Sequence, residues 1–281
     1  MIKKPFKSKK KNGLRMKIMS IFGTRPEIIR MSRIFELLDN NFDHVMVNTS
    51  QNFTHELNTV FFDEMKIRKP DYDMRVNTEA YGKEVADVII KAEKLLKKEK
   101  PDILLILGDT NSGLSAIPAA YQGIKIAHLE AGMRSYDPRM PEEKNRVMID
   151  HLSTVLLPYT HYSRDNLIRE NIHPSKIYVV GNPIIEVIQH YLPKIEKSRI
   201  LESLKLKKND YFLVTAHRTE NVDNKASLKN IFLGLEKISK TFRKKIIYPI
   251  HPRTMSKINK LEIPKGIKLI NPLGFFDFSK L

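Results

Sequence analysis

The 281-residue chain contains no cysteine and no tryptophan. Without cysteine it forms neither disulfides nor thiolate metal sites, and we expect a cytoplasmic protein. No stretch approaches the ~20 apolar residues of a membrane span, so we expect no membrane insertion. The glycine pattern GxGxxG is absent from the first predicted strand-to-helix turn, which reads GTRPEI. This absence argues against the usual NAD site.

Positive charge is abundant, with 49 lysine and arginine residues against 32 acidic ones and a formal net charge of +17. The opening residues 1–15, MIKKPFKSKKKNGLR, are dense in lysine and almost free of apolar residues, which predicts a basic disordered tail. No stretch interleaves basic residues with stacking aromatics, as RNA-binding folds usually do. We therefore expect no nucleic-acid partner.

Short apolar runs rich in β-branched residues alternate with segments of helical period, which predicts α/β domains with parallel sheets. We place an N-terminal Rossmann-like domain at 16–185 and a smaller, incomplete one at 186–281. The expected strands are 17–23, 44–50, 102–109, 125–132, 154–160 and 176–182, then 210–218, 244–252 and 267–274. The expected helices are 26–38, 55–65, 83–100, 112–123, 141–153, 162–171, 184–208, 227–242 and 254–261.

Polar side chains follow these strands at the carboxyl edge, where open parallel sheets bind ligands. Arg25 follows the first strand, Asp109 ends the third and Glu130 lies at the end of the fourth. In the second domain His217 and His251 take corresponding positions. Acids, histidines and arginines of both sheets are thus predicted to face one cleft.

Several of these residues have a structural alternative. Asp109, with its neighbour Thr110, is as readily explained as a helix N-cap, and Glu142 as a favourable charge in a first helical turn. His128, within a strand, is more simply a packed core residue. Glu130 favours function, because a carboxylate that closes an apolar strand is costly to bury without a partner. His217 and His251 lack the spacing of a zinc motif.

The turn GTRPEI predicts an anion site. Pro26 suits the first helical turn, where its missing N–H is not needed. Arg25 is able to bind an anion through two hydrogen bonds, and Arg30 lies about one turn further along the helix. A phosphate bound here would depend on the helix N-terminus and arginine rather than on glycines.

The motifs FGTRPEIIRM, ILGDTNSGLSA, HLEAGMRSYDPRMPEEKNR, GNPIIEV, TAHRTENVD, IHPRT and INPLGFFDF occur in this order. From Met16 to Leu281 the chain resembles the non-hydrolysing UDP-N-acetylglucosamine 2-epimerases. The resemblance implies a GT-B-like fold of two doubly wound domains, a UDP-sugar substrate, no cofactor and no metal, and a homodimer. The family interconverts UDP-GlcNAc and UDP-ManNAc by eliminating and re-adding UDP, in surface polysaccharide synthesis.

Site residues follow from the matching motifs. The resemblance implies proton transfer by Asp109, Glu130 and Glu142, and places His217 beside the diphosphate. Arginine at position 30 replaces the family's lysine. The substrate-binding candidates are Arg25, Arg30, Arg134, Arg146, Arg218 and His251.

Two departures leave alternatives open. The family's TGQH, linked to an allosteric UDP-GlcNAc site, reads TSQN at 49–52, which argues against that regulation. The family's later DSGG segment is not found before Leu281, so we expect a C-terminally truncated chain. The alternatives are an epimerase for another UDP-2-acetamido sugar, a hydrolysing homologue that releases UDP, and an inactive truncated homologue that only binds a partner or nucleotide.

Overall fold

The computed structural model describes residues 15–50, 59–216, 224–250, 255, 258 and 263–281. The chain forms two compact units that divide after His190. The predicted basic tail falls outside the described residues except for Arg15. The guanidinium of Arg15 donates hydrogen bonds to the carbonyl oxygens of Asn40 and Phe42, 3.3 and 3.1 Å away.

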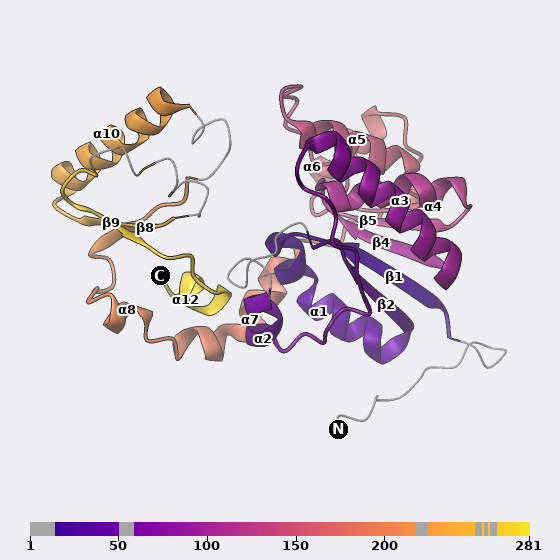
Figure 1. Cartoon of the computed structure of the whole chain (residues 1–281), viewed down its shortest axis with the longest axis horizontal. Coiled ribbons are helices and arrows are strands. Elements are labelled where there is room, and N and C mark those ends of the chain that lie inside the picture. Colours follow the sequence, from indigo (N-terminus) through magenta and orange to yellow (C-terminus); the bar gives the residue numbers. More distant parts are fainter. Residues whose placement is uncertain (1–14, 51–58, 217–223, 251–254, 256–257, 259–262) are drawn as a thin grey trace. The chain divides into compact units, whose positions relative to one another are not determined.

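The first unit is built on a parallel six-stranded sheet with the order β3-β2-β1-β4-β5-β6. Figure 1 labels its four central strands, β2, β1, β4 and β5. The strands are β1 (Lys17–Phe22), β2 (Asp43–Asn48), β3 (Tyr72–Asp73), β4 (Ile103–Leu107), β5 (Lys125–Leu129) and β6 (Val155–Leu157). This is the doubly wound order, and it reverses between β1 and β4. The carboxyl ends of these two neighbours therefore border the crevice where such sheets bind ligands.

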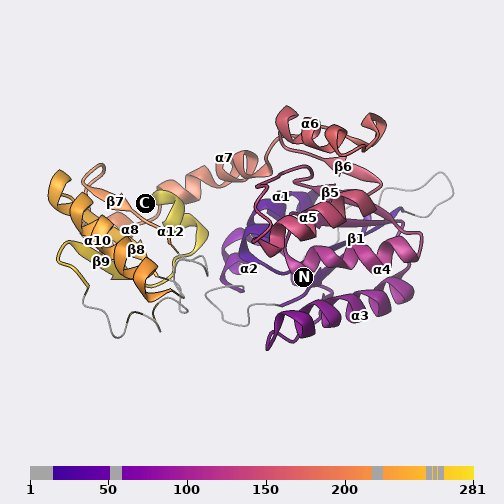
Figure 2. The same ribbon diagram turned by 90° about the horizontal axis from the view of Figure 1, so that it is seen from above.

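Helices cover both faces of this sheet. They are α1 (Arg25–Asn41), α2 (Thr59–Met65), α3 (Tyr81–Glu99), α4 (Ala116–Tyr121), α5 (Pro141–Leu152) and α6 (His161–Arg169), with 3-10 turns η2 (Asn111–Ser115) and η3 (Pro174–Lys176). Helices α3, α4 and α5 gather on one face (Figure 2) and enclose a core that includes Met19, Leu104 and Ile106. On the other face α1 packs against β1, with the rings of Phe22 and Phe35 4.9 Å apart.

Two sequence predictions about this sheet are wrong. Residues 176–182 form no strand, and Ile177 makes only an isolated bridge to Leu156. The segment is the outermost one, and Tyr178 and Val180 in it are half exposed. The true edge strand at the other end is β3, within a stretch that the sequence predicted to be a loop.

The second unit contains the three predicted strands, which form a parallel sheet in the order β7-β8-β9. Its strands are β7 (Tyr211–Leu213), β8 (Lys245–Pro249) and β9 (Ile267–Ile270), and its helices are α8 (Ile200–Ser203), α10 (Lys225–Phe242) and α12 (Phe275–Lys280). Helix α10 packs through Leu228 and Phe232 onto Ile246 and Tyr248. The helix predicted at 254–261 falls mostly outside the described residues. Helix α7 (Pro183–Glu196) carries the chain from the first unit into the second.

In the described part of the chain, no helix is long and apolar enough to cross a bilayer.

Candidate functional site

Three of the predicted residues belong to the carboxyl edge of the first sheet. Asp109 comes two residues after β4, Glu130 directly follows β5, and Arg30 lies in α1, which begins just beyond β1. Strands β4 and β5 pair in register from Ile103 to Leu107, so their polar endings lie on adjacent strands. The topology thus brings these side chains to the point where strand order reverses.

Glu130 forms an ion pair with Arg30, joining Oε2 to Nη1. Both side chains are largely buried, with exposed fractions of 11% and 20%. The backbone of Glu130 is left-handed, with φ of +68°, and its N–H donates to the carbonyl of Leu157 at the end of β6, 3.1 Å away. A non-glycine residue pays about 1–2 kcal/mol for this conformation. The left-handed backbone at Glu130 therefore sets the direction of its carboxylate and lowers the stability of the protein.

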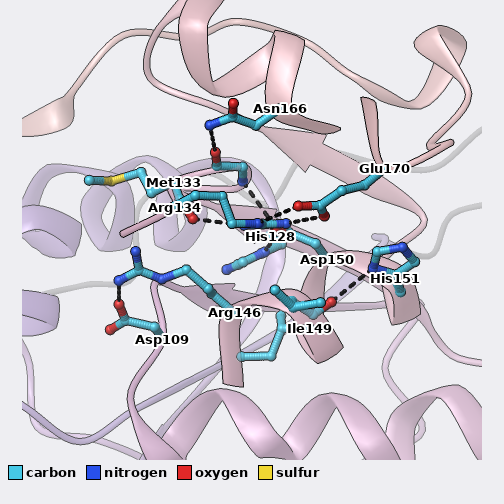
Figure 3. A network of polar contacts seen from close by, with 12 residues as sticks. Asp109, His128, Met133, Arg134, Arg146, Ile149, Asp150, His151, Asn166 and Glu170 are labelled. Carbon is cyan, nitrogen blue, oxygen red and sulfur yellow. Dashed lines mark hydrogen bonds and ion pairs between the residues drawn. The ribbon is translucent and has the colours of Figure 1, made fainter. Parts of the chain in front are cut away.

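Asp109 forms a second ion pair, with Arg146 of α5 (Figure 3). The backbone carbonyl of Asp109 also accepts a hydrogen bond from Nδ2 of Asn145, 3.0 Å away. Arg146 Nη1 lies 3.4 Å from Glu143, one turn earlier on α5. These contacts place Asp109 in a charged cluster rather than in a helix cap, because Thr110 is the N-cap residue of η2.

Gly108, the residue before Asp109, leaves room for the Glu130 carboxylate. It has φ of +74°, and a methyl group added there would lie 3.3 Å from Oε1 of Glu130. The Glu130 carboxylate thus lies against the residue that precedes Asp109. The sequence predicted that GD and EAG, which contain Gly108 and Glu130, would close neighbouring strands. It did not predict the direction of the Glu130 side chain.

Arg25 is the first residue of α1 and is half buried. Burial lowers the pKa of its guanidinium, and none of the described residues forms an ion pair or hydrogen bond with it. A desolvated cation at a helix N-terminus is favourable only with an anion nearby. Its position is that of an anion-binding group.

Glu27 stabilises the turn between β1 and α1, which carries Arg25. It is buried, and Oε2 accepts hydrogen bonds from the N–H groups of Gly23 and Thr24, at 3.1 and 2.8 Å. Oε1 accepts a bond of 2.5 Å from the hydroxyl of Ser112 in η2. Burial raises the pKa of Glu27, although these hydrogen bonds oppose the shift. The motif's glutamate thus joins the start of α1 to the segment after β4.

Glu142 lies in the first turn of α5 and is half buried. Its carboxylate has no hydrogen bond or ion pair with any residue of the described ranges. The geometry is compatible both with the predicted proton transfer and with a favourable charge at the helix N-terminus.

Arg134 takes part in a buried network of charged and polar groups. Its side chain is 1% exposed, and its guanidinium contacts Asp150 at 2.8 Å and Glu170 at 2.5 Å (Figure 3). Asp150 in turn bonds His128, whose other ring nitrogen lies 2.8 Å from the carbonyl oxygen of Gly108. This buried network favours a structural role for Arg134 over the predicted substrate contact, and the core interpretation of His128.

The second unit's candidates His217, Arg218 and His251 lie outside the described residues, as do Gln51 and Asn52 of TSQN. In the described ranges, no group of three or more histidines or carboxylates is arranged to hold a metal ion.

The carboxylates of Asp109 and Glu130 are each paired with an arginine. Arg25 has no ion-pair partner among the described residues. Carboxylates at such a site serve proton transfer, and an arginine at a helix N-terminus serves to bind an anionic group. The first unit is thus equipped for acid–base chemistry on an anionic substrate.

Comparison with known proteins gives consistent matches. A family model described as UDP-N-acetylglucosamine 2-epimerase matches residues 36–281. The chain is 41% identical over 277 residues to the UDP-N-acetylglucosamine 2-epimerase of Methanocaldococcus jannaschii, covering 95% of this chain and 76% of that protein. It is 32% identical over 267 residues to a UDP-2,3-diacetamido-2,3-dideoxy-D-glucuronate 2-epimerase of Pseudomonas aeruginosa, covering 93% of this chain and 74% of the relative.

A solved structure also matches: the M. jannaschii UDP-GlcNAc 2-epimerase in complex with UDP-GlcNAc and UDP, with a TM-score of 0.88 and 40% identity. The alignment covers 94% of this chain and 75% of that one. This likeness confirms the predicted GT-B-like α/β fold class. The chain spans about three quarters of the length of these relatives.

Proposed function

The chain belongs to the UDP-N-acetylglucosamine 2-epimerase family, and from this membership we propose that it interconverts UDP-GlcNAc and UDP-ManNAc. It is accordingly an isomerase that acts on carbohydrates. The observation that carries the proposal is the pair of carboxylates, Asp109 and Glu130, on adjacent strand ends, each paired with an arginine.

The reaction inverts C2 of the sugar, whose proton is not acidic in the intact substrate. Breaking the C1–O bond releases UDP with the bonding electrons and leaves positive charge at C1, which makes the C2 proton removable by a base. Loss of that proton gives a 2-acetamidoglucal. UDP then adds back to C1 while C2 takes a proton on its opposite face. No net oxidation occurs, so the reaction needs only acids, bases and cations.

The site residues are assigned to these steps as follows. Asp109, Glu130 and Glu142 transfer the protons, and Arg25 receives the departing diphosphate at the N-terminus of α1. Arg30 and Arg146 hold the carboxylates of Glu130 and Asp109 in place. From their motifs alone, His217 is expected to lie beside the diphosphate, and Arg218 and His251 are expected to bind the substrate.

Proton NMR in deuterated water tests this function. Incubated with UDP-GlcNAc, the protein should incorporate deuterium at C2 and form UDP-ManNAc. Appearance of free ManNAc and UDP instead would identify a hydrolysing homologue. An intact protein that binds UDP-GlcNAc but leaves C2 unlabelled would refute the proposal and favour an inactive homologue.

A second substrate is suggested by the P. aeruginosa relative, whose printed name refers to UDP-2,3-diacetamido-2,3-dideoxy-D-glucuronate. The greater identity to the M. jannaschii protein, 41% against 32%, favours UDP-GlcNAc. Comparing kcat/KM for the two nucleotide sugars decides between them. We further propose a cytoplasmic homodimer that serves surface polysaccharide synthesis. In light scattering it should show twice the chain mass of 32.7 kDa.

A further inference from the structure

Tyr159 lies at the carboxyl edge of the first sheet, and none of the sequence motifs pointed to it as a site residue. It comes two residues after β6, beyond Leu157, whose carbonyl accepts the N–H of Glu130. Strands β5 and β6 pair in parallel with Leu129 opposite Leu157. Glu130 and Tyr159 therefore follow adjacent strands at the same carboxyl edge.

The hydroxyl of Tyr159 is buried without a hydrogen-bond partner among the described residues. The whole residue is only 8% exposed. A buried hydroxyl that makes no hydrogen bond destabilises a protein, and phenylalanine would fill nearly the same space without that cost. A polar group in this position is explained if a ligand supplies the missing bond.

The surroundings indicate which kind of ligand. The positive charge of Arg30, which pairs with Glu130, favours the ionised form of the Tyr159 hydroxyl and so lowers its pKa. Burial nevertheless raises the pKa of Tyr159 to about 12, so the phenol stays neutral at physiological pH. A neutral hydroxyl both donates and accepts, which suits sugar hydroxyls and amide groups. The positive charge of Arg30 is already paired with Glu130 and is therefore less available to a phosphate at this position.

We propose that the Tyr159 hydroxyl hydrogen-bonds the 2-acetamido sugar of the bound nucleotide sugar, beside Glu130, and so positions that sugar. The inference rests on the proposed function for the identity of its ligand. It adds a specificity-determining residue on the sugar rather than on the diphosphate.

Tyr159→Phe tests the proposal, because it removes only the hydroxyl. The melting temperature of the free protein should rise by about 2 °C, since an unsatisfied buried group is removed. KM for UDP-GlcNAc should rise about fivefold, the scale of one lost hydrogen bond. The thermal shift caused by UDP-GlcNAc should shrink, while the shift caused by UDP should stay as in wild type.

Tyr121→Phe is the matched control, because Tyr121 is 89% exposed, and it should change none of these quantities. An unchanged response of Tyr159→Phe to UDP-GlcNAc would overturn the proposal. An equal loss with UDP would place the contact on the diphosphate and overturn the sugar assignment. A lower melting temperature would reveal a partner within the protein and also count against it.

The proposed function is tested separately by deuterium exchange in the wild type. If the wild type binds UDP-GlcNAc without exchange, the epimerase proposal fails, while the binding test of Tyr159 still applies. A wild type that binds neither UDP-GlcNAc nor UDP overturns both.

Discussion

Glu130 combines a strained backbone with a paired carboxylate. Its φ of +68° is unusual for a residue with a side chain, and such conformations persist where the surroundings hold them in place. Arg30 binds the carboxylate, and the N–H of Glu130 is bonded to β6. The position of this carboxylate is therefore fixed from both its side chain and its backbone before any substrate arrives.

Removing the acid–base function of either carboxylate should slow the reaction strongly. We expect Asp109→Asn and Glu130→Gln each to lower kcat at least ~100-fold, the usual contribution of such groups. Glu79→Gln, which alters an exposed carboxylate paired with Lys83, should leave kcat unchanged. Deuterium incorporation at C2 provides the rate. Near-normal turnover in both site variants would exclude these roles.

Gly108→Ala should damage the site through a contact as well as through strain. The added methyl group would lie 3.3 Å from the Glu130 carboxylate, at a residue with φ of +74°. We expect a loss of about 1–2 kcal/mol in the free energy of unfolding from the backbone, and a fall in kcat from the displaced carboxylate.

Gly123→Ala separates the two effects. Gly123 has φ of +68° but nothing within 4 Å of an added methyl group. This variant should lose similar stability in urea unfolding and keep its kcat. If Gly108→Ala retained kcat as well, the contact with Glu130 would have no catalytic importance.

Individual residues show which parts of the site could be predicted from the sequence. The positions of Asp109 and Glu130 at the carboxyl edge of the sheet were predictable because each residue follows an apolar strand. Their arginine partners were not, since Arg30 and Arg146 come from helices distant in sequence. Arg134 looked equally suitable for substrate, but its burial by Asp150 and Glu170 depends on how α5 and α6 pack.

At the scale of elements, the start of α1 depends on Glu27. Its carboxylate accepts hydrogen bonds from the residues that lead into the helix and from Ser112 in η2. It therefore joins two elements that border the crevice. Its effect on the site is indirect, through the orientation of the turn that bears Arg25.

Glu27→Ala should lower the free energy of unfolding by about 3 kcal/mol, because it removes a helix cap and leaves buried donors unpaired. Glu36→Ala, on the same helix with a side chain 58% exposed, is the control and should cost far less. Urea unfolding gives both values. Equal losses for the two variants would show that the buried contacts contribute nothing specific.

Elements with a strong apolar pattern were predictable, and marginal ones were not. Strands β1, β2, β4 and β5 follow from apolar, β-branched runs. β3 is only the pair Tyr72–Asp73, too short and polar to give a pattern. Residues 176–182 have a strand-like composition but lie at the sheet edge, where Gly181 turns left-handed with φ of +79°. Edge pairing is decided by tertiary contacts rather than by local composition.

At the scale of the whole molecule, the buried network around Asp150 links stability to pH. Burial alone would raise the pKa of Asp150, but His128 and Arg134 outweigh it and hold the pKa below the ordinary value of 3.8. Folding therefore favours the ionised carboxylate. The resulting stabilisation is present above pH 3.8 and is lost as the pH falls through the lower folded-state pKa.

Asp150→Asn should be less stable than wild type at pH 7, because Arg134 loses an ionic partner. As the pH is lowered below 3.8, its stability should fall less steeply than that of the wild type. Urea unfolding at several pH values checks both expectations. Parallel curves for the two proteins would exclude Asp150 as a source of the acid sensitivity.

Helix α7 runs from Pro183 to Glu196, while the compact units divide after His190. The border thus falls inside a helix rather than in a loop. A gene fragment that ends at the border would cut this helix and expose unpaired carbonyl groups at its new end. Separate production of either half should therefore retain the complete helix, through Glu196 for the first half and from Pro183 for the second.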